Sequence, residues 1–185
     1  LYGSYLYDDS EIDITNRSKA SNNIKNLEGN NTTSSITGKL VYDSRNKPFN
    51  ANRGSNHEAE IEYAGLGGDF TFTKTTLGTA WHFPVWGKLT GYWRGQGGWI
   101  DDRGRTPDYD KFFLGGPNTV RGVDRKDVSP EEETDDGDNK VLVGSEVYVA
   151  FNHELHYPIA EDLGLVAITF VDMGDQWRQS NEVEF

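Results

Sequence analysis

The segment VLVGSEVYVAFNHELHY, residues 141–157, decides the fold class, because polar and apolar side chains alternate along it. Successive side chains of a β-strand point to opposite faces of the sheet, so this alternation predicts one strand with an apolar and a polar face. The predicted apolar face comprises Val141, Val143, Val147, Val149, Phe151, Leu155 and Tyr157. The predicted polar face comprises Gly144, Glu146, Tyr148, Asn152, Glu154 and His156.

Similar alternation occurs before and after this segment, and no stretch of useful length has a helical period. Glu58, Glu60 and Glu62 share one face of a predicted strand, and three charged carboxylates require that face to contact water. A shift of the apolar phase predicts a β-bulge near residues 74–76. The predicted fold is all-β and antiparallel, with strands at residues 1–14, 32–42, 55–64, 69–83, 88–100, 141–157 and 163–173 and a long loop at 101–140.

The length of these strands favours a membrane protein over a soluble β-sandwich. Most of them span about 10 to 17 residues, whereas strands of soluble proteins have about 5 to 6. A tilted strand needs about 9 to 11 residues to cross a bilayer. Aromatic residues near strand ends also suit the interfacial belts of a transmembrane β-barrel. These residues are Tyr42, Tyr63, Trp81, Phe83, Trp86, Trp99 and Tyr157.

Composition excludes several other classes of function. The net charge of −12 argues against nucleic-acid binding, and the absence of cysteine excludes disulfide and thiolate-metal frameworks. The four histidines have no metal-binding spacing, so we expect no metal and no other cofactor. The acidic run at residues 131–138 suits a solvated loop tip better than a weak calcium site.

Paired carboxylates raise the alternative of a glycosidase. Residues two apart on one strand are neighbours by geometry alone, and acidic faces are common in barrel interiors. We therefore expect no catalytic residue and no enzyme activity. The candidate carboxylate pairs are Glu58 with Glu60, Asp108 with Asp110, and Glu154 with Asp172.

The long loop contains the run FFLGGPNTVRG, residues 112–122. Its glycines and its proline enforce turns, and a loop of about 40 residues between two strands is usually functional. This run resembles the marker loop of a known family. Phe113, Gly115, Gly116, Val120, Arg121 and Gly122 match that marker, and residues 43–54, 66–74 and 170–174 match other stretches in the same order.

The family comprises the outer-membrane assembly and two-partner secretion barrels, or bacterial surface antigen family, to which the assembly factor BamA belongs. The resemblance implies a sixteen-stranded barrel, of which this chain would be a C-terminal piece lacking substrate-binding POTRA domains. It also implies that Arg121 folds inward to meet Glu154, on the polar face of its strand, and Asp172, at the end of the last strand. Such a cluster either pins the loop or takes a direct part in transport.

The resemblance also implies the function of the parent protein. It would be integral to the bacterial cell outer membrane and would assemble and insert unfolded β-barrel proteins there without enzymatic chemistry. Its partners would be those substrates, outer-membrane lipid and accessory assembly lipoproteins. Two alternatives remain open from the sequence: a two-partner secretion or translocation pore of the same family, and a plain diffusion porin.

Overall fold

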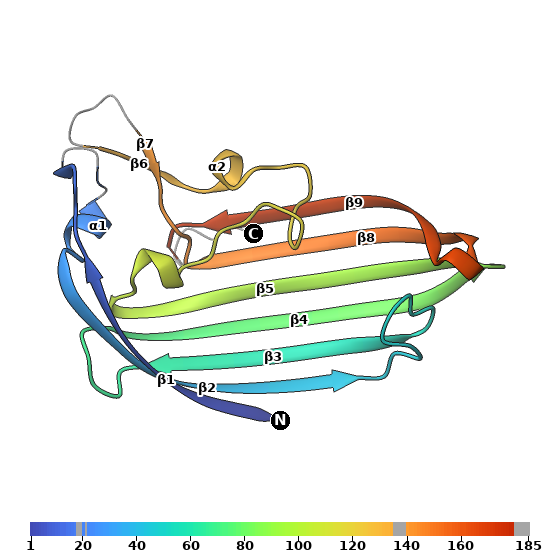
Figure 1. Ribbon diagram of the computed structural model, residues 1–185, viewed down its shortest axis with the longest axis horizontal. Coiled ribbons are helices and arrows are strands. Elements are labelled where there is room, and N and C mark those ends of the chain that lie inside the picture. Colours follow the sequence, from blue (N-terminus) through green and yellow to red (C-terminus); the bar gives the residue numbers. More distant parts are fainter. Residues whose placement is uncertain (18–19, 21, 135–139, 180–185) are drawn as a thin grey trace.

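The computed structural model describes residues 1–17, 20, 22–134 and 140–179, and within them seven antiparallel strands form one sheet (Figure 1). Its order is β1-β2-β3-β4-β5-β8-β9. The prediction of an all-β antiparallel fold is therefore confirmed. The strands are β1 (Tyr2–Ile12), β2 (Gly29–Asp43), β3 (Gly54–Ala64), β4 (Thr71–Trp86), β5 (Leu89–Arg105), β8 (Val147–Ala160) and β9 (Leu165–Trp177).

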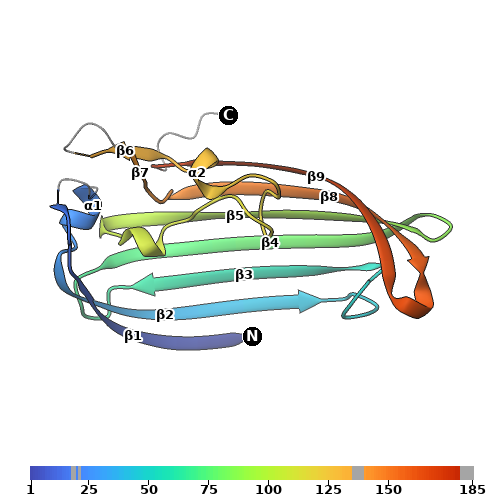
Figure 2. The ribbon, with the colours of Figure 1, turned by 45° about the horizontal axis from the view of Figure 1, so that its top comes forward.

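Helical elements are short. They are α1 (Asn22–Lys25), α2 (Arg125–Val128) and the 3-10 turns Asp108–Asp110 and Glu161–Leu163. In the described ranges, no helix is long and apolar enough to cross a membrane. A small separate sheet pairs β6 (Glu131–Glu133) with β7 (Lys140–Leu142). The sheet is curved, and the connection from β5 to β8 lies against one of its faces, which we call the inner face (Figures 1 and 2).

The two faces of the sheet differ in chemistry, as the alternating sequence requires. The inner face carries charged side chains, and on it Lys39 lies 3.4 Å from Glu58 and 3.2 Å from Glu60. The outer face is apolar and exposed. Its exposed large side chains include Ile36, Leu40, Ile61, Leu77, Trp81, Trp99, Phe151, Leu155, Val171 and Met173. A contiguous apolar surface of this extent marks contact with a membrane or another protein, and a polar opposite face is typical of a barrel wall.

Residues 141–157 do not form a single strand, and this prediction is wrong. The first two residues of the range, Val141 and Leu142, pair with β6, and β8 begins only at Val147. Val143 is completely buried, and its N–H donates to the Pro130 carbonyl, 2.9 Å away. The apolar phase continues through this region although Val143 is buried within the connection from β5 to β8 instead of facing outward from the sheet.

The predicted bulge at residues 74–76 is also wrong, because β4 pairs in unbroken register there. Phe72 lies on the inner face, whereas Leu77 lies on the outer face. Phe72 is completely buried in an apolar cluster with Leu27, Ala64, Phe70 and Ile100. The change of apolar phase therefore reflects a local inner core at this end of the sheet.

Several predicted strand ends differ from the structure, including the start of β2 and the end of β8. The range 101–140 is not all loop, because β5 continues to Arg105 and the β6–β7 hairpin lies within the connection. β9 continues to Trp177 by pairing with β8, so Asp172 lies inside the strand and not at its end. β4 likewise continues through Pro84, with a register irregularity between Pro84 and Trp86.

Candidate functional site

The connection from β5 to β8 is docked on the inner face by apolar side chains. Leu114 and Val120 form a buried cluster with Ala150 of β8. Phe112 packs against Tyr148, with ring centroids 4.7 Å apart. The Lys74 ammonium lies 4.9 Å from the centre of the Phe112 ring, which adds a cation–π contact. The loop is therefore part of the packed structure of the wall.

Two glycines on the sheet make this close approach possible. A Cβ atom at Gly98 would lie 2.6 Å from Phe112 Cζ. A Cβ atom at Gly174 would lie 3.0 Å from both Leu114 Cδ2 and Val120 Cγ2. A larger residue at either position would require neighbouring loop side chains to shift, so we refer to Gly98 and Gly174 as the loop sockets.

The predicted loop-motif residues shape the turn that presents Arg121. Gly115, Gly116 and Gly122 have φ angles of 108°, 95° and 79°, in the region that favours glycine. The Gly115 N–H donates to Thr119 Oγ1 at 2.9 Å, and the Gly116 N–H reaches the Val120 carbonyl at 3.1 Å. Val120 is buried, whereas Phe113 is only half-buried. The adjacent Phe112 supplies the aromatic contact with the sheet.

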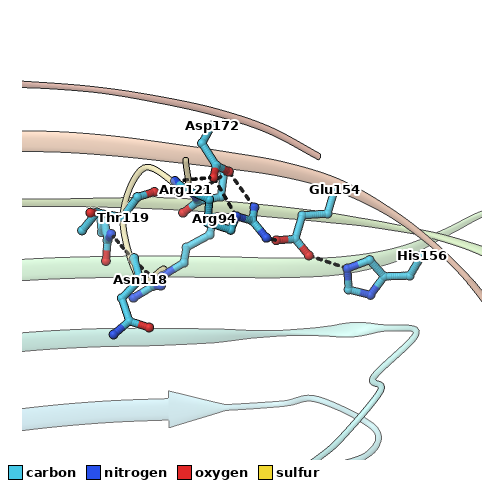
Figure 3. A network of polar contacts seen from close by, with 9 residues as sticks. Arg94, Asn118, Thr119, Arg121, Glu154, His156 and Asp172 are labelled. Carbon is cyan, nitrogen blue, oxygen red and sulfur yellow. Dashed lines mark hydrogen bonds and ion pairs between the residues drawn. The ribbon is translucent and has the colours of Figure 1, made fainter. Parts of the chain in front are cut away.

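The structure brings the three predicted loop–lumen residues Arg121, Glu154 and Asp172 together (Figure 3). Arg121 Nε donates to Asp172 Oδ2 at 2.6 Å, and Nη2 donates to Oδ1 at 2.6 Å. The Arg121 backbone N–H also donates to Oδ2, at 3.0 Å. Nη1 lies 2.6 Å from Glu154 Oε1. One guanidinium thus binds carboxylates of two neighbouring strands, with the two-pronged geometry that strengthens such pairs.

The surroundings keep this ion pair charged. The Asp172 side chain is only 3% exposed and that of Glu154 is 11% exposed, whereas Arg121 retains 25% exposure. The hydrogen bonds to Asp172, and then those to Glu154, raise the pKa of Arg121 above its usual value, although burial opposes this effect. The Arg121 guanidinium also lies 3.8 Å above the centre of the Phe170 ring. Arg121 therefore remains a cation with neighbours on three sides.

Sequence reasoning missed four further residues of the site. Arg94, Gln96 and Asn152 donate to backbone carbonyls of the loop, and His156 Nε2 lies 2.5 Å from Glu154 Oε2. All four lie on the polar faces of their strands. That position gave the only available signal, because the acceptors in the loop are mostly backbone oxygens that no sequence pattern reveals.

The other acidic candidates are held apart from this site or lie elsewhere. Glu58 and Glu60 bind Lys39, and Asp108 and Asp110 lie in a 3-10 turn of the loop. In the part of the chain that the structure describes, no group of three or more His, Cys, Asp or Glu residues could hold a metal ion. Residues 135–138 of the predicted acidic run lie outside the described residues.

An open antiparallel sheet with an apolar outer face, a charged inner face and a loop docked on that inner face defines a class of protein. It is a section of the wall of a β-barrel with a loop folded into its interior. Residues 2–185 match the family model described as the Omp85 superfamily domain, and the chain belongs to that superfamily. The family resemblance seen in the sequence is therefore confirmed.

Comparison with individual proteins gives the same result. The chain is similar to the outer membrane protein assembly factor BamA of Nitratidesulfovibrio vulgaris, with 26% identity over 86% of this chain and 20% of that protein. It is also similar to the sorting and assembly machinery component 50 homolog of Bos taurus, with 30% identity over 74% of this chain and 28% of that protein. The chain thus spans less than a third of the length of these curated relatives.

A solved structure agrees with the fold. The crystal structure of BamA from Haemophilus ducreyi lacking POTRA domains 1–3 matches with a TM-score of 0.75 at 18% identity. The match covers 94% of this chain and 37% of that chain. At this level of identity the comparison supports the architecture alone.

Proposed function

We propose that this chain is a section of the wall of an integral β-barrel that assembles and inserts β-barrel proteins into the bacterial outer membrane. The observation that carries the proposal is the docked loop, in which Arg121 binds Glu154 and Asp172 inside the curved sheet. A plain diffusion pore would share the alternation and the charged inner face, but it would lack a loop with the Val120-Arg121-Gly122 motif folded against that face. The names of the relatives, an assembly factor and an assembly machinery component, support the same function.

The open edges of the sheet support the proposal that this section belongs to a larger barrel. β1 and β9 each pair with one neighbour within the described sheet, so each presents an edge of unpaired backbone groups. Hydrocarbon cannot satisfy such groups, which is why strands cross membranes only in closed barrels. We therefore propose that further strands of the parent protein close the barrel, to the sixteen strands implied by the family resemblance.

The proposed mechanism contains no chemical step. The apolar outer face would contact outer-membrane lipid, while the loop holds β5, β8 and β9 in fixed positions from inside. The substrates would be unfolded outer-membrane β-barrel proteins, which the parent protein receives and inserts. Accessory assembly lipoproteins are included in the proposal as partners of the parent protein, without assignment to residues of this chain.

Charge reversal at Arg121 in the full-length parent protein tests this function. Arg121→Glu would place a third carboxylate beside Glu154 and Asp172, which should expel the loop and reduce the yield of substrate barrels inserted into proteoliposomes. Lys88→Glu is the matched control, because Lys88 forms an exposed ion pair with Glu161 on a turn far along the sheet. Normal insertion by the Arg121→Glu variant would refute the proposal. It would also be refuted if neither the unmodified protein nor the variant inserted substrate barrels and the substitution changed only ion conductance.

A further inference from the structure

A second set of contacts holds the loop, separate from the Arg121 ion pair. Arg94 Nη1 and Gln96 Nε2 both donate to the Asn118 carbonyl, at 3.2 Å and 3.0 Å. Asn152 Nδ2 donates to the adjacent Thr119 carbonyl at 2.7 Å. We call these three donors, Arg94, Gln96 and Asn152, the carbonyl clamp. Figure 3 shows Arg94 reaching toward Asn118 beside the ion pair.

The clamp binds a turn whose shape is already fixed. The Thr119 N–H donates to the Gly116 carbonyl at 3.2 Å, and Thr119 Oγ1 accepts from the Gly115 N–H at 2.9 Å. These internal bonds occupy the groups that face into the turn. The carbonyls of Asn118 and Thr119 are then available to donors on the sheet, and they accept regardless of the loop side chains.

Asn152 differs from the other two donors because it also belongs to the ion pair. It is 5% exposed, and besides the Thr119 carbonyl its amide nitrogen donates to Asp172 Oδ1 at 2.8 Å. A side chain that donates in two directions from one nitrogen must carry at least two hydrogens on it, as the Asn152 amide does, whereas a carboxylate offers only acceptors. Asn152 therefore orients the Asp172 carboxylate that Arg121 binds.

Arg94 and Gln96 lie outside this arrangement. Within the described residues they share no hydrogen-bond or ion-pair partner with Arg121, and their acceptor lies three positions before it in the chain. Contacts that share no partner are expected to be coupled more weakly than contacts in one network. The geometry thus separates the clamp into an independent part and a coupled part.

We propose that Arg94, Gln96 and Asn152 are positioning residues that fix how deeply the loop enters the barrel. Their hydrogen bonds to the loop can break while the Arg121 ion pair remains intact. Only Asn152 couples these hydrogen bonds to the ion pair. This inference rests on the proposed function for its biological meaning, but the contacts themselves can be tested without an activity assay.

The test is a pair of double-mutant cycles on the full-length parent protein in detergent, read as hydrogen-exchange protection of the backbone amides of residues 115, 116 and 118–122. Gln96→Ala should raise the opening of the loop about 2- to 10-fold, as expected for loss of one neutral hydrogen bond. Asn152→Ala should raise it by about 10-fold or more, because a hydrogen bond to a charged group is lost too. Arg121→Gln completes both cycles.

The fold-changes of Gln96→Ala and Arg121→Gln should multiply, whereas those of Asn152→Ala and Arg121→Gln should combine to less than their product. Gln96→Lys keeps a donor and should restore protection, while Gln96→Glu, of the same size but an acceptor, should not. Thr37→Ala is the control, since Thr37 lies on the inner face of β2, away from the docked loop.

Protection that is unchanged in Gln96→Glu and Asn152→Ala would overturn the proposal, and so would equal coupling of both residues to Arg121. Exchange of the β3 amides reports whether each variant is folded. Insertion of substrate barrels is measured separately on the same proteins. If the loop opens as expected and insertion stays normal, the clamp stands and the proposed role of the docked loop fails.

Discussion

The two carboxylates that bind Arg121 should not be equivalent, and neutralising each one in turn measures the difference. Asp172 accepts three hydrogen bonds from Arg121 and is 3% exposed. Glu154 accepts one contact from Arg121 and is 11% exposed. We therefore expect Asp172→Asn to release the loop far more readily than Glu154→Gln.

The magnitudes follow from the number of contacts and their burial. Breaking a buried ion pair costs about 3–5 kcal/mol. Asp172→Asn should lie at the lower end, about 3 kcal/mol, because Glu154 still compensates part of the Arg121 charge. Glu154→Gln keeps a carbonyl oxygen toward Arg121, so its cost should be about 1.5 kcal/mol, the lower value for a charged hydrogen bond.

Since about 1.4 kcal/mol corresponds to a tenfold change in an equilibrium constant, loop opening should increase about 100-fold in Asp172→Asn and about tenfold in Glu154→Gln. The measurement is hydrogen-exchange protection of the backbone amides of residues 115, 116 and 118–122 in the full-length parent protein, with the β3 amides as a folding control. Equal effects, or a larger effect of Glu154→Gln, would refute the argument from contact number and burial.

Three further predictions concern other parts of the wall. Gly174→Val should make the loop more susceptible to protease, because a Cβ there would lie 3.0 Å from Leu114 and Val120. Gly38→Ala is the control and should leave cleavage unchanged, because the space around Gly38 is open. Equal cleavage of the two variants would argue against the role of Gly174 as a loop socket. Burial raises the pKa of Asp110 to about 6, although the charge of Lys74 acts in the opposite direction. The folded loop therefore favours the protonated carboxyl group more than the unfolded loop does. Protection of residues 106–114 should then be greatest below about pH 4 and decrease as the pH rises through about 6, and Asp110→Asn should remove that dependence. Phe151→Arg on the outer face should destabilise the barrel in lipid by about 2–4 kcal/mol if the site lies near the bilayer midplane, whereas Thr76→Arg on the inner face should be tolerated. Urea-unfolding midpoints in lipid vesicles compare the two, and equal losses would contradict the assignment of faces.

The sequence predicted the sheet because alternation is a local property of each strand. It could not separate β7 from β8, since residues 141–145 lie outside the seven-stranded sheet while keeping the same alternation. Burial of Val143 depends on Pro130 and the rest of the loop above it, which no window of neighbouring residues contains. The error at residues 74–76 has the same origin, because Phe72 packs against Leu27, which is distant in the sequence.

The candidate site was predictable only in part, for a related reason. Arg121 stood out as one cation in a glycine-rich run, and the family resemblance named its two carboxylates. Arg94 and Gln96 carry no comparable signal, since their partner is a backbone carbonyl. Gly98 was visible as a glycine among several on its strand, but its role depends on the Phe112 ring of the loop. Contacts between side chains and a distant backbone require the structure.

The position of the site across the sheet connects loop docking to strand register. Arg94 lies directly opposite Asn152, and Asn152 lies opposite Asp172, so one row crosses β5, β8 and β9. A slip of one residue in either pairing would turn part of this row to the outer face, because side chains alternate with a period of two. The loop would then lose both the clamp and the ion pair. A charged inner face alone does not specify register, since neighbouring polar residues could pair in several ways. The docked loop does so, because its carbonyls bind side chains of β5 and β8 while the Arg121 guanidinium binds carboxylates of β8 and β9.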